Sequence, residues 1–265
     1  MHDGNSSRKS FFSPSNNPET DTSSIIFFID IYLIQLICYL SANKHIDTKT
    51  QALIPMQKIM LLNPKGGCGK STISTNLAAY YANHELSVAI ADYDPQKSSL
   101  NWLRQRTFDF APITSININT KQIEYPNNLD YLIMDTPAGL EKEKMQQLIQ
   151  LTDNIIIPIL PSPIDIQAAA YFIYQLLLKY RITNEDKNIC LVANRVKQRS
   201  QIYNELIKFT NSIKLPLITS LRDSQNYVKY AVKGASIFDH KSKQTEQCRN
   251  DWLPLTHWIK EKSVT

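Results

Sequence analysis

The amino-acid sequence predicts an α/β fold in which a mostly parallel central sheet carries helices on both faces. Short apolar segments alternate along the chain with segments of helical periodicity, which is the pattern of a parallel sheet covered on both sides. Glycine is scarce, at 6 of 265 residues, yet three glycines stand close together after the first apolar segment. Several later apolar segments end in a polar residue, and in open sheets of this kind ligands collect at the carboxyl ends of strands.

Strands are expected where short apolar runs suit a buried strand, and helices where apolar residues recur at helical spacing, as Ile73, Leu77 and Tyr80 do. The strand candidates are residues 58–62, 87–92, 131–135, 154–160, 188–193 and 215–220. The helix candidates are residues 72–82, 99–106, 141–151, 166–180, 201–212, 224–233 and 245–260. Strand and helix therefore alternate from the first strand to the last.

Composition agrees with one folded domain behind an N-terminal extension. From Met56 onward the chain has 210 of its 265 residues, enough for one α/β domain with a full core. Charged residues make up 20% and hydrophobic residues 43%, which speaks against a disordered chain and against many membrane spans. The cysteines Cys38, Cys68, Cys190 and Cys248 are scattered, so we expect reduced thiols rather than a disulfide framework or a zinc site.

The first 55 residues differ in character from the rest. Residues 1–24 are rich in Ser, Asn, Asp and Pro, which predicts disorder. Residues 25–40 are apolar but interrupted by Asp30 and Gln35, and they are shorter than the roughly 20 residues of a membrane span. No small-residue cleavage site of the secretory kind follows. We expect residues 1–55 to have no role in the fold; a membrane-binding or partner-binding helix, or a helix packed on the domain, are the alternatives.

The three clustered glycines lie in a segment that reads Asn-Pro-Lys-Gly-Gly-Cys-Gly-Lys-Ser-Thr, residues 63–72. A strand, a glycine loop, Lys-Ser and a helix in this order predict a phosphate-binding loop. Backbone N–H groups would surround the phosphates, Lys70 would reach the β- and γ-phosphates, and the Ser71 hydroxyl would bind Mg²⁺. The nucleotide-binding candidates here are Lys65, Gly66, Gly67, Cys68, Gly69, Lys70, Ser71 and Thr72.

The loop departs from the general pattern, which has glycine where this chain has Pro64. It reads K-G-G-x-G-K-[ST] instead, with a second lysine, Lys65, before the glycines. In this the chain, from about Met56 to its end, resembles the ParA/MinD family of deviant Walker A P-loop ATPases. The resemblance implies the P-loop NTPase fold, ATP and Mg²⁺ as cofactors, and a domain that starts near Met56. It also implies that Lys65 reaches into the partner's site when two subunits close over their nucleotides.

The second expected strand ends in Asp92-Tyr-Asp94-Pro-Gln96. A carboxylate leaving a strand beside the phosphate loop is placed to hold and polarise the water that attacks the γ-phosphate. In the family that the chain resembles, the second acid of this first switch, here Asp94, positions the water. Asp92 is expected to support the metal site and the loop. The catalytic candidates are thus Lys65, Lys70 and Asp94; a turn that merely contains two strand-terminal acids is the alternative.

Two further strands end in candidate site residues. Four apolar residues precede Asp135, the pattern of a Walker B strand whose acid binds Mg²⁺, and residues 136–139 resemble the second switch. A later strand ends in Asn194, whose amide offers the donor and the acceptor that suit the edge of adenine. The family uses an Asn here for the base, and residues 161–165 resemble the segment on the base's other side. Alternatively, Asn194 caps the following loop.

Positive charge is concentrated in the C-terminal third. Residues 195–249 contain eleven Lys or Arg and four Asp or Glu, a net charge of +7, whereas the whole chain carries +5. Such an excess indicates a polyanion partner, with a solvated helical surface as the alternative. The resemblance favours DNA, which partition members of the family bind non-specifically as dimers. Arg222 is the preferred contact, with Lys208, Lys229 and Lys233 as helpers.

Other branches of the superfamily fit less well. A nitrogenase-reductase-like protein would need cysteines beyond each switch, and a bacterial tyrosine kinase would need a terminal cluster of tyrosines. A MinD-like protein would end in a membrane-binding amphipathic helix. Here Trp252, Leu255 and Ile259 share one helical face, but Pro254 interrupts it, so we expect core packing rather than membrane contact.

The resemblance is thus closest to ParA-like partition ATPases. It implies a homodimer in ATP, non-specific DNA binding, and hydrolysis stimulated by a ParB-like or other cargo-bound activator. The expected location is cytoplasmic and associated with the nucleoid. A MinD-like, membrane-associated positioning ATPase is the main alternative, and a metabolic or metal-loading enzyme on the same fold is a third. The cargo cannot be read from the sequence.

Overall fold

The computed structural model describes residues 55–118, 123, 125–179, 182, 187–197, 200–213, 215–240 and 242–263. The expected extension at residues 1–55, with its apolar segment at 25–40, lies outside the described residues except for Pro55.

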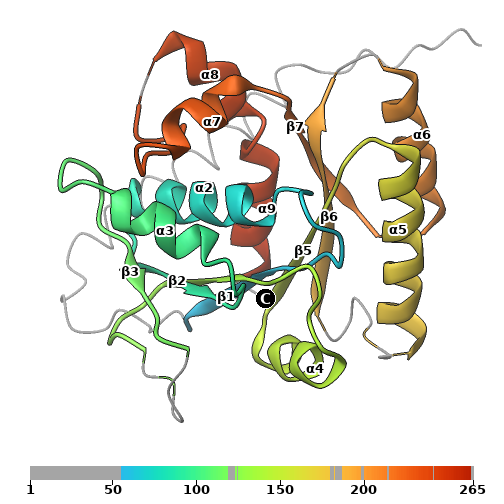
Figure 1. Ribbon diagram of the computed structural model, residues 1–265, viewed down its shortest axis with the longest axis horizontal. Helices are drawn as coiled ribbons and strands as arrows, with labels where there is room; N and C mark the ends of the chain where they lie inside the picture. The colour runs from blue at the N-terminus through green and yellow to red at the C-terminus, as the bar shows by residue number, and fades with distance from the viewer. Residues whose placement is uncertain are drawn as a thin grey trace, which may run out of the picture. The chain divides into compact units, whose positions relative to one another are not determined.

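The described chain forms a seven-stranded sheet in which every neighbouring pair is parallel (Figure 1). The strands are β1 (Gln57–Leu61), β2 (Val88–Asp92), β3 (Thr114–Ser115), β4 (Tyr131–Asp135), β5 (Asn154–Ile159), β6 (Asn188–Val196) and β7 (Leu217–Arg222). Their order across the sheet is β3-β2-β4-β1-β5-β6-β7. The predicted α/β class with a parallel sheet is confirmed. The edge strand β3 was not predicted, because two residues are too few to show a periodicity.

Helices cover both faces of the sheet (Figure 1). The helices packed on one face are α2 (Lys70–Ala82), α3 (Ser98–Gln105), α7 (Gln225–Ala231), α8 (Lys243–Asn250) and α9 (Leu253–Lys262). Those on the other are α4 (Lys142–Leu151), α5 (Pro163–Tyr174) and α6 (Gln201–Ser212), and a π-helical turn, Gln175–Lys179, continues α5. Among the described residues, no helix is long and apolar enough to cross a membrane.

Alternation along the strands builds the two cores. Successive strand residues point to opposite faces, so Ile59 and Leu61 of β1 join the cluster under α2, and Met60 joins the cluster under α4 and α5. Because both faces are covered, the central strands β2, β4 and β5 are buried along their whole length rather than on alternate residues, whereas the edge strands β3 and β7 are not. This explains why the strands were recognisable in the sequence as continuous apolar runs.

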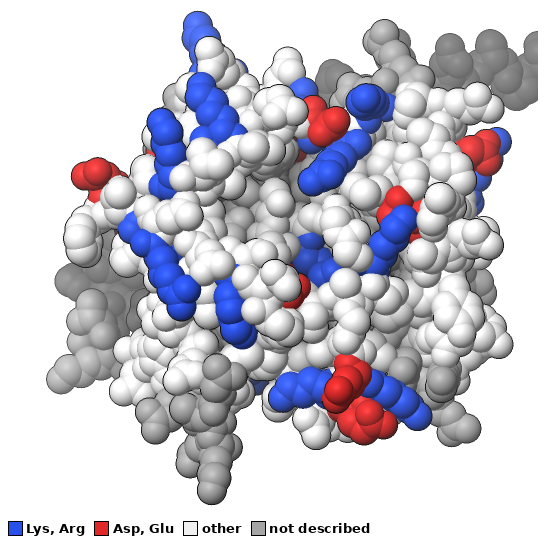
Figure 2. All heavy atoms as spheres, in the orientation of Figure 1, with Lys and Arg blue, Asp and Glu red and all other residues white. Residues whose placement is uncertain are grey.

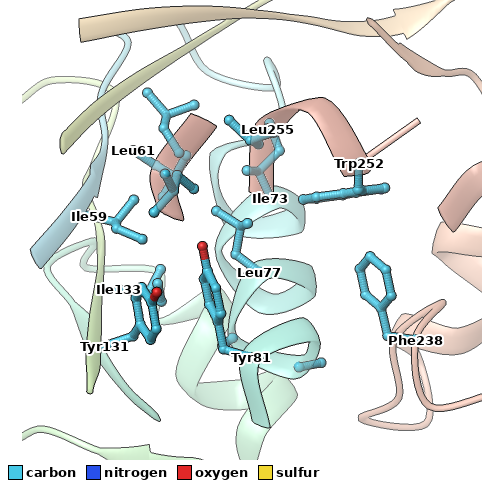
Figure 3. Packing of buried hydrophobic residues seen from close by; sticks show 14 of the residues in the cluster. Ile59, Leu61, Ile73, Leu77, Tyr81, Tyr131, Ile133, Phe238, Trp252 and Leu255 are labelled. Carbon is cyan, nitrogen blue, oxygen red and sulfur yellow. The ribbon is translucent and has the colours of Figure 1, made fainter. Parts of the chain in front are cut away.

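Helix α2, which follows the phosphate loop directly, is fixed by the larger core shown in Figure 3. Its Leu77 and Tyr81 are buried, and the Tyr81 ring stacks on that of Tyr131 in β4 with 3.8 Å between centroids. Trp252 and Leu255 close the core from the C-terminal side, and both are 0% exposed. The burial of these two residues and of Ile259 confirms core packing for the C-terminal apolar face.

Two helix predictions were wrong in part. The single helix expected at 245–260 is two helices, α8 and α9, because Pro254 lacks an N–H and stands at the start of α9. The helix expected from residue 166 begins at Pro163, since the Ser162 side chain accepts a hydrogen bond from the Asp165 backbone N–H and caps α5. Proline therefore marks a helix start in both places.

Candidate functional site

The loop between β1 and α2 contains two glycines in a backbone conformation that other residues rarely adopt. Gly67 has φ +76° and Gly69 has φ +98°, in the left-handed region. A Cβ at position 69 would also lie 2.0 Å from Nδ2 of Asn194, so a side chain there would have to displace the Asn194 amide. Gly66, by contrast, has nothing within 4 Å of a built Cβ and is exposed. Glycine is thus needed at 69 for both conformation and space.

Lys70, Ser71 and Thr72 form the first turn of α2, where backbone N–H groups are free to bind an anion. The buried Lys70 side chain folds back over the loop, and its Nζ donates to the carbonyl oxygens of Asn63, at 2.9 Å, and Lys65, at 3.2 Å. Asn63 in turn donates to the Pro158 carbonyl at 2.6 Å, which ties the loop to β5. The loop is therefore arranged around the Lys70 ammonium.

Cys68, inside the loop, is buried, and its Sγ lies 3.3 Å from the carbonyl oxygen of Lys65. Burial raises the pKa of the Cys68 thiol above its ordinary value, against the opposing effect of the Lys70 ammonium. A protonated thiol is a poor nucleophile. Cys68 thus contributes packing and a weak hydrogen bond to the loop.

Lys65 lies at the mouth of the loop, with its side chain 34% exposed. Its Nζ is 2.9 Å from Oδ1 of Asp165, in the first turn of α5. The Asp165 side chain is 10% exposed and also contacts the Ser162 hydroxyl. Sequence reasoning placed residues 161–165 beside the base and missed this pairing; the available signal was an acid in the first turn behind a Ser-Pro cap.

The first switch is folded around Asp92, which is 0% exposed. Its carboxylate accepts hydrogen bonds from the backbone N–H groups of Asp94, at 3.0 Å, and of Leu100 in α3, at 3.1 Å. Asp94 is half-buried and accepts from the Gln96 N–H at 2.9 Å. Asp92 therefore shapes the turn and joins it to α3, while Asp94 stands at the surface of the site.

Asp135, at the end of β4, is the most perturbed acid of the site. It is 0% exposed, and burial raises its pKa from 3.8 to about 6, against opposing hydrogen bonds from Ser99 and Ser71. Ser99, the buried second residue of α3, was missed by sequence reasoning, although it lies a few residues beyond the first switch. Asp135 thus stands where three elements meet: its own strand β4, the start of α2 with Ser71, and the start of α3 with Ser99.

The residues around Asp135 fit a hydrated Mg²⁺. Oδ1 of Asp135 is buried and has no hydrogen-bond partner among the described residues. Such an atom is costly to bury unless something satisfies it. Mg²⁺ takes carboxylate and hydroxyl oxygens and keeps several waters, so the Ser71 hydroxyl and Asp135 would hold it here, and it would neutralise charge on a phosphate.

Asn194 packs against the phosphate loop. Its side-chain Nδ2 donates to the Cys68 carbonyl at 2.8 Å, and its Oδ1 accepts from the Arg195 backbone N–H at 3.0 Å. Beside it, the carboxyl ends of β5 and β6 line a pocket of about 310 Å³. The lining residues are Leu160, Pro161, Ser162, Arg195, Lys197, Ser200 and Ile202. Pro161 and Ser162, from the segment expected beside the base, therefore line a pocket that is large enough for a nucleotide base and lies next to Asn194.

The four cations proposed for DNA do not gather on one face. Lys208 is on α6, whose Leu206 belongs to the core opposite that of α7, and its Nζ lies 3.2 Å from Glu205. Lys229 lies in the last turn of α7, and Lys233 follows that helix; both are exposed. The structure thus separates Lys208 from the other helpers.

Arg222, at the end of β7, forms a two-pronged ion pair with Asp251. Its Nε and Nη2 donate to the Asp251 carboxylate at 2.6 and 2.8 Å, and its Nη1 donates to Gln247 at 2.7 Å. The side chain is 27% exposed. Arg222 therefore braces β7 against the turn between α8 and α9, with its charge largely balanced.

Comparison with known proteins agrees with this geometry. Residues 59–237 match the CobQ/CobB/MinD/ParA nucleotide binding domain. "Maintenance of carboxysome distribution protein A" of Halothiobacillus neapolitanus is 30% identical over 188 residues, which cover 68% of this chain and 86% of that protein.

Two solved structures show the same fold. A plasmid partition protein of Borrelia burgdorferi bound to AMPPNP has a TM-score of 0.60 at 16% identity, over 77% of this chain and 99% of its own. The cell division protein MinD of Aquifex aeolicus has a TM-score of 0.58 at 18% identity, over 76% of this chain and 97% of its own. The matched family segment includes the glycine loop, Asp94, Asp135 and Asn194. This chain belongs to the CobQ/CobB/MinD/ParA family of nucleotide-binding domains.

Proposed function

We propose that this protein is an ATP-dependent switch: two copies close face to face over their nucleotides, bind DNA without sequence preference, and position a cargo through ATP hydrolysis. The observation that carries the proposal is the pair of lysines in one loop. Lys70 is buried at the centre of the loop, whereas Lys65 is partly exposed at its mouth and held by one carboxylate. An ordinary phosphate loop needs only the first.

Each group of the site has a role in hydrolysis. Lys70 and the N–H groups at the start of α2 bind the β- and γ-phosphates of ATP. Ser71 and Asp135 hold the cation that neutralises phosphate charge. Asp94, half-buried at the edge of the site, holds and orients the attacking water. The base lies in the pocket lined by Pro161, Ser162 and Arg195, next to Asn194.

Lys65 completes the partner's site in the dimer. It leaves Asp165 and approaches the phosphates bound by the other copy, where it acts as an arginine finger does. Its single ion pair is one-third exposed on the lysine side, and pairs of this kind stabilise weakly, by about 0.2–1 kcal/mol. The exchange of a carboxylate for a polyphosphate is therefore favourable once two nucleotides face each other.

DNA binding relies on the exposed Lys229 and Lys233, with Arg222 in a positioning role because Asp251 balances its charge. Two copies that each bind DNA weakly act as one bivalent site in the dimer. A cargo-bound activator then stimulates hydrolysis and releases the dimer. In this proposal the protein works on the nucleoid, in the cytoplasm.

The 30% identity with a carboxysome distribution protein favours a protein assembly as cargo over a plasmid, since the plasmid partition match is structural, at 16% identity. A MinD-like, membrane-associated ATPase is the second candidate, favoured by the fold shared with MinD. It ranks lower because Leu255, Trp258 and Ile259 of α9 are buried in the core.

The experiment compares wild type with Lys65→Gln. In ATP with Mg²⁺, wild type is expected to dimerise, measured by light scattering after size exclusion, and to sediment with duplex DNA but not with liposomes. Lys65→Gln is expected to keep ATP binding and to lose dimers and DNA binding together. Lys208→Ala, on the opposite face, serves as the matched control. A Lys65→Gln protein that dimerises like wild type would contradict the two-lysine mechanism, and sedimentation with liposomes alone would favour the MinD-like candidate.

A further inference from the structure

The carboxyl ends of α3 and α7 touch backbone to backbone. Gly234, three residues beyond α7, has φ +64°, and a Cβ there would lie 2.3 Å from the Arg106 nitrogen and 2.4 Å from the Gln105 carbonyl carbon. Real Cβ atoms do not approach backbone so closely, so only glycine permits the contact. The two helix ends, more than 120 residues apart in the chain, therefore lie side by side; we call this contact the α3–α7 joint.

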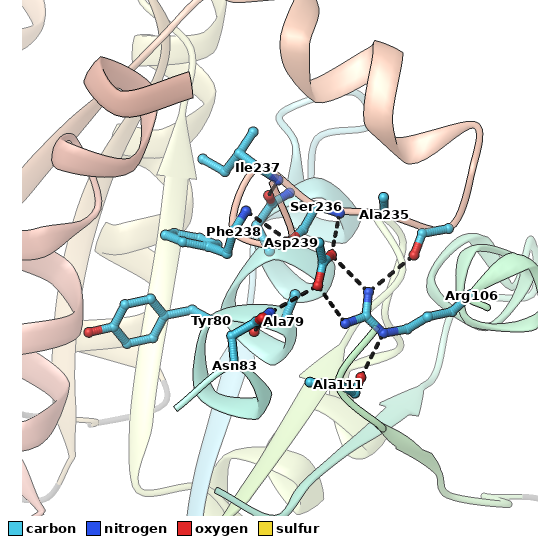
Figure 4. Close-up of polar contacts among 12 residues, drawn as sticks. Ala79, Tyr80, Asn83, Arg106, Ala111, Ala235, Ser236, Ile237, Phe238 and Asp239 are labelled. Carbon is cyan, nitrogen blue, oxygen red and sulfur yellow. Dashed lines mark hydrogen bonds and ion pairs between the residues drawn. The ribbon is translucent and has the colours of Figure 1, made fainter. Parts of the chain in front are cut away.

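A buried ion pair fastens the joint (Figure 4). Arg106 and Asp239 lie 2.7 Å apart with side chains 4% and 1% exposed. The Arg106 guanidinium also donates to the carbonyl oxygens of Gly234, at 3.2 Å, and Ala111, at 2.9 Å. Burial alone raises the pKa of Asp239, but hydrogen bonds from Arg106 and Asn83 outweigh it and hold that pKa below its ordinary value. Asp239 is thus ionised near neutral pH.

A further bond crosses the joint, since the Trp102 indole N–H of α3 donates to the Ala235 carbonyl at 3.0 Å. With the buried pair and the glycine contact, this makes α3 and α7 one rigid body. Side chains at the two helix ends therefore keep a fixed spacing from one another.

The exposed charges on the two helices themselves are of one sign, although the exposed acids Asp109 and Asp223 stand in the segments that flank them. Helix α3 carries Arg104 and no acid; α7 carries Lys229 and no acid, and Lys233 stands next to Gly234. Within the described chain, Arg104 makes one hydrogen bond, at 2.9 Å to the neutral amide of Asn101, which leaves its charge unbalanced. Lys208 on the opposite face, by contrast, is paired with Glu205.

Figure 2 shows the same distribution over a wider area. In the shared orientation, α8, α7 and α3 lie one below another on the left of Figure 1, and blue side chains follow this side of Figure 2 while red is sparse there. A mostly basic surface of this kind attracts a polyanion and releases its counterions.

We propose that α3 and α7 form one phosphate-binding surface for duplex DNA, in which Arg104 of α3 acts together with Lys229 and Lys233 of α7. The inference rests on the proposed function and adds to it a DNA contact outside the basic C-terminal third. Because Arg104 and Lys233 flank the same rigid joint, both contact the DNA backbone in one encounter rather than independently.

The test measures the binding of the full chain to a fluorescent duplex of random sequence, in ATP and Mg²⁺, across a salt series. Each lost phosphate contact lowers the slope of log K against log salt by about 0.9, and at 0.1 M salt weakens binding about eightfold. Arg104→Ala and Lys233→Ala are each expected to lower the slope by about 0.9 per protomer, and thus by up to about 1.8 in a dimer. Arg104→Lys is expected to restore most of the binding, and Lys208→Ala to leave it within twofold of wild type.

The outcomes separate the two proposals. If wild type binds DNA and Arg104→Ala behaves like Lys208→Ala, the surface on α3 is overturned and the proposed function stands. If wild type binds no DNA in ATP, the DNA step of the proposed function fails, and this inference fails with it. Binding to phosphatidylglycerol vesicles in place of DNA, with the same dependence on Arg104, overturns the choice of partner. Thermal unfolding of each variant, expected to match wild type, excludes misfolding as the cause.

Discussion

The phosphate loop and the α3–α7 joint hold their cations in opposite ways. At the loop, Lys70 is buried against two carbonyl oxygens and Lys65 is paired with Asp165. At the joint, only Arg106 is neutralised, by Asp239, while Arg104 beside it is exposed and bonded to a neutral amide. The lysines of the loop are therefore bound to protein groups, and a ligand must displace these groups to reach the lysines. At the joint, by contrast, the Arg104 charge is exposed to solvent. Which cations are available is decided by position in the fold.

The sharpest way to break this comparison is Lys70→Ala. The substitution removes the cation at the centre of the loop and with it the charge-assisted contacts to phosphate, so we expect no measurable ATP binding, a loss of several kcal/mol. Equilibrium binding of labelled ATP measures it, with Lys208→Ala as the control. An affinity within threefold of wild type would show that the loop does not bind the β- and γ-phosphates.

Asp239→Asn tests the joint. It leaves the Arg106 guanidinium buried without its partner, and breaking a buried pair in this way costs about 3–5 kcal/mol of unfolding free energy. Urea denaturation measures the loss. Replacing both partners by apolar residues, Arg106→Met with Asp239→Leu, is expected to recover part of it. Glu205→Ala, which breaks the exposed pair on α6, is expected to change the unfolding free energy by less than about 1 kcal/mol; equal effects of the two substitutions would contradict the contrast between joint and surface.

Asp135→Asn has the smallest expected effect and the opposite sign. In the folded chain the pKa of Asp135 is about 6, against an ordinary 3.8. Between these values the folded state binds more protons than the unfolded state, so without Mg²⁺ the free energy of unfolding falls as pH rises from about 4 to about 6. The loss at neutral pH is about 3 kcal/mol.

Asparagine cannot ionise, so Asp135→Asn is expected to raise the thermal midpoint in EDTA at pH 7.5, and this gain should disappear only as the pH falls below the ordinary carboxyl pKa of 3.8. Mg²⁺ should stabilise wild type and leave the variant unchanged. Asp109→Asn, at an exposed acid, is the control. A variant that is destabilised at pH 7.5 would show that the ionised carboxylate is satisfied within the protein, and that no cation is needed to satisfy it.

Much of the fold could be predicted from the sequence because its signals are local. Continuous apolar runs marked the strands of the sheet's centre, and the glycine loop was placed correctly between β1 and α2. The incorrect predictions also have local causes. The break between α8 and α9 depends on Pro254, which lies inside the single helix predicted at residues 245–260. The strand β3 has two residues and no periodicity to detect.

The sequence named most residues of the candidate site one by one, but it could not give their pairings. Lys65 and Asp165 are 100 positions apart, and Asn194 donates to Cys68 across 126 positions. No spacing rule links such residues; only the order of strands across the sheet brings them together. The same holds for the basic C-terminal third, where sequence proximity grouped Lys208 with Lys229 although the sheet separates them.

The α3–α7 joint also sets a rule for building chimeras between this chain and its relatives. Gly234 accepts no side chain, Arg106 needs the carboxylate of Asp239, and both contacts join segments that lie far apart in the sequence. A graft that imports residues 225–239 from another protein without residues 102–106 would therefore carry half of an interlocked pair. The two segments behave as one transplantable unit, so any exchange of α3 or α7 should move both together.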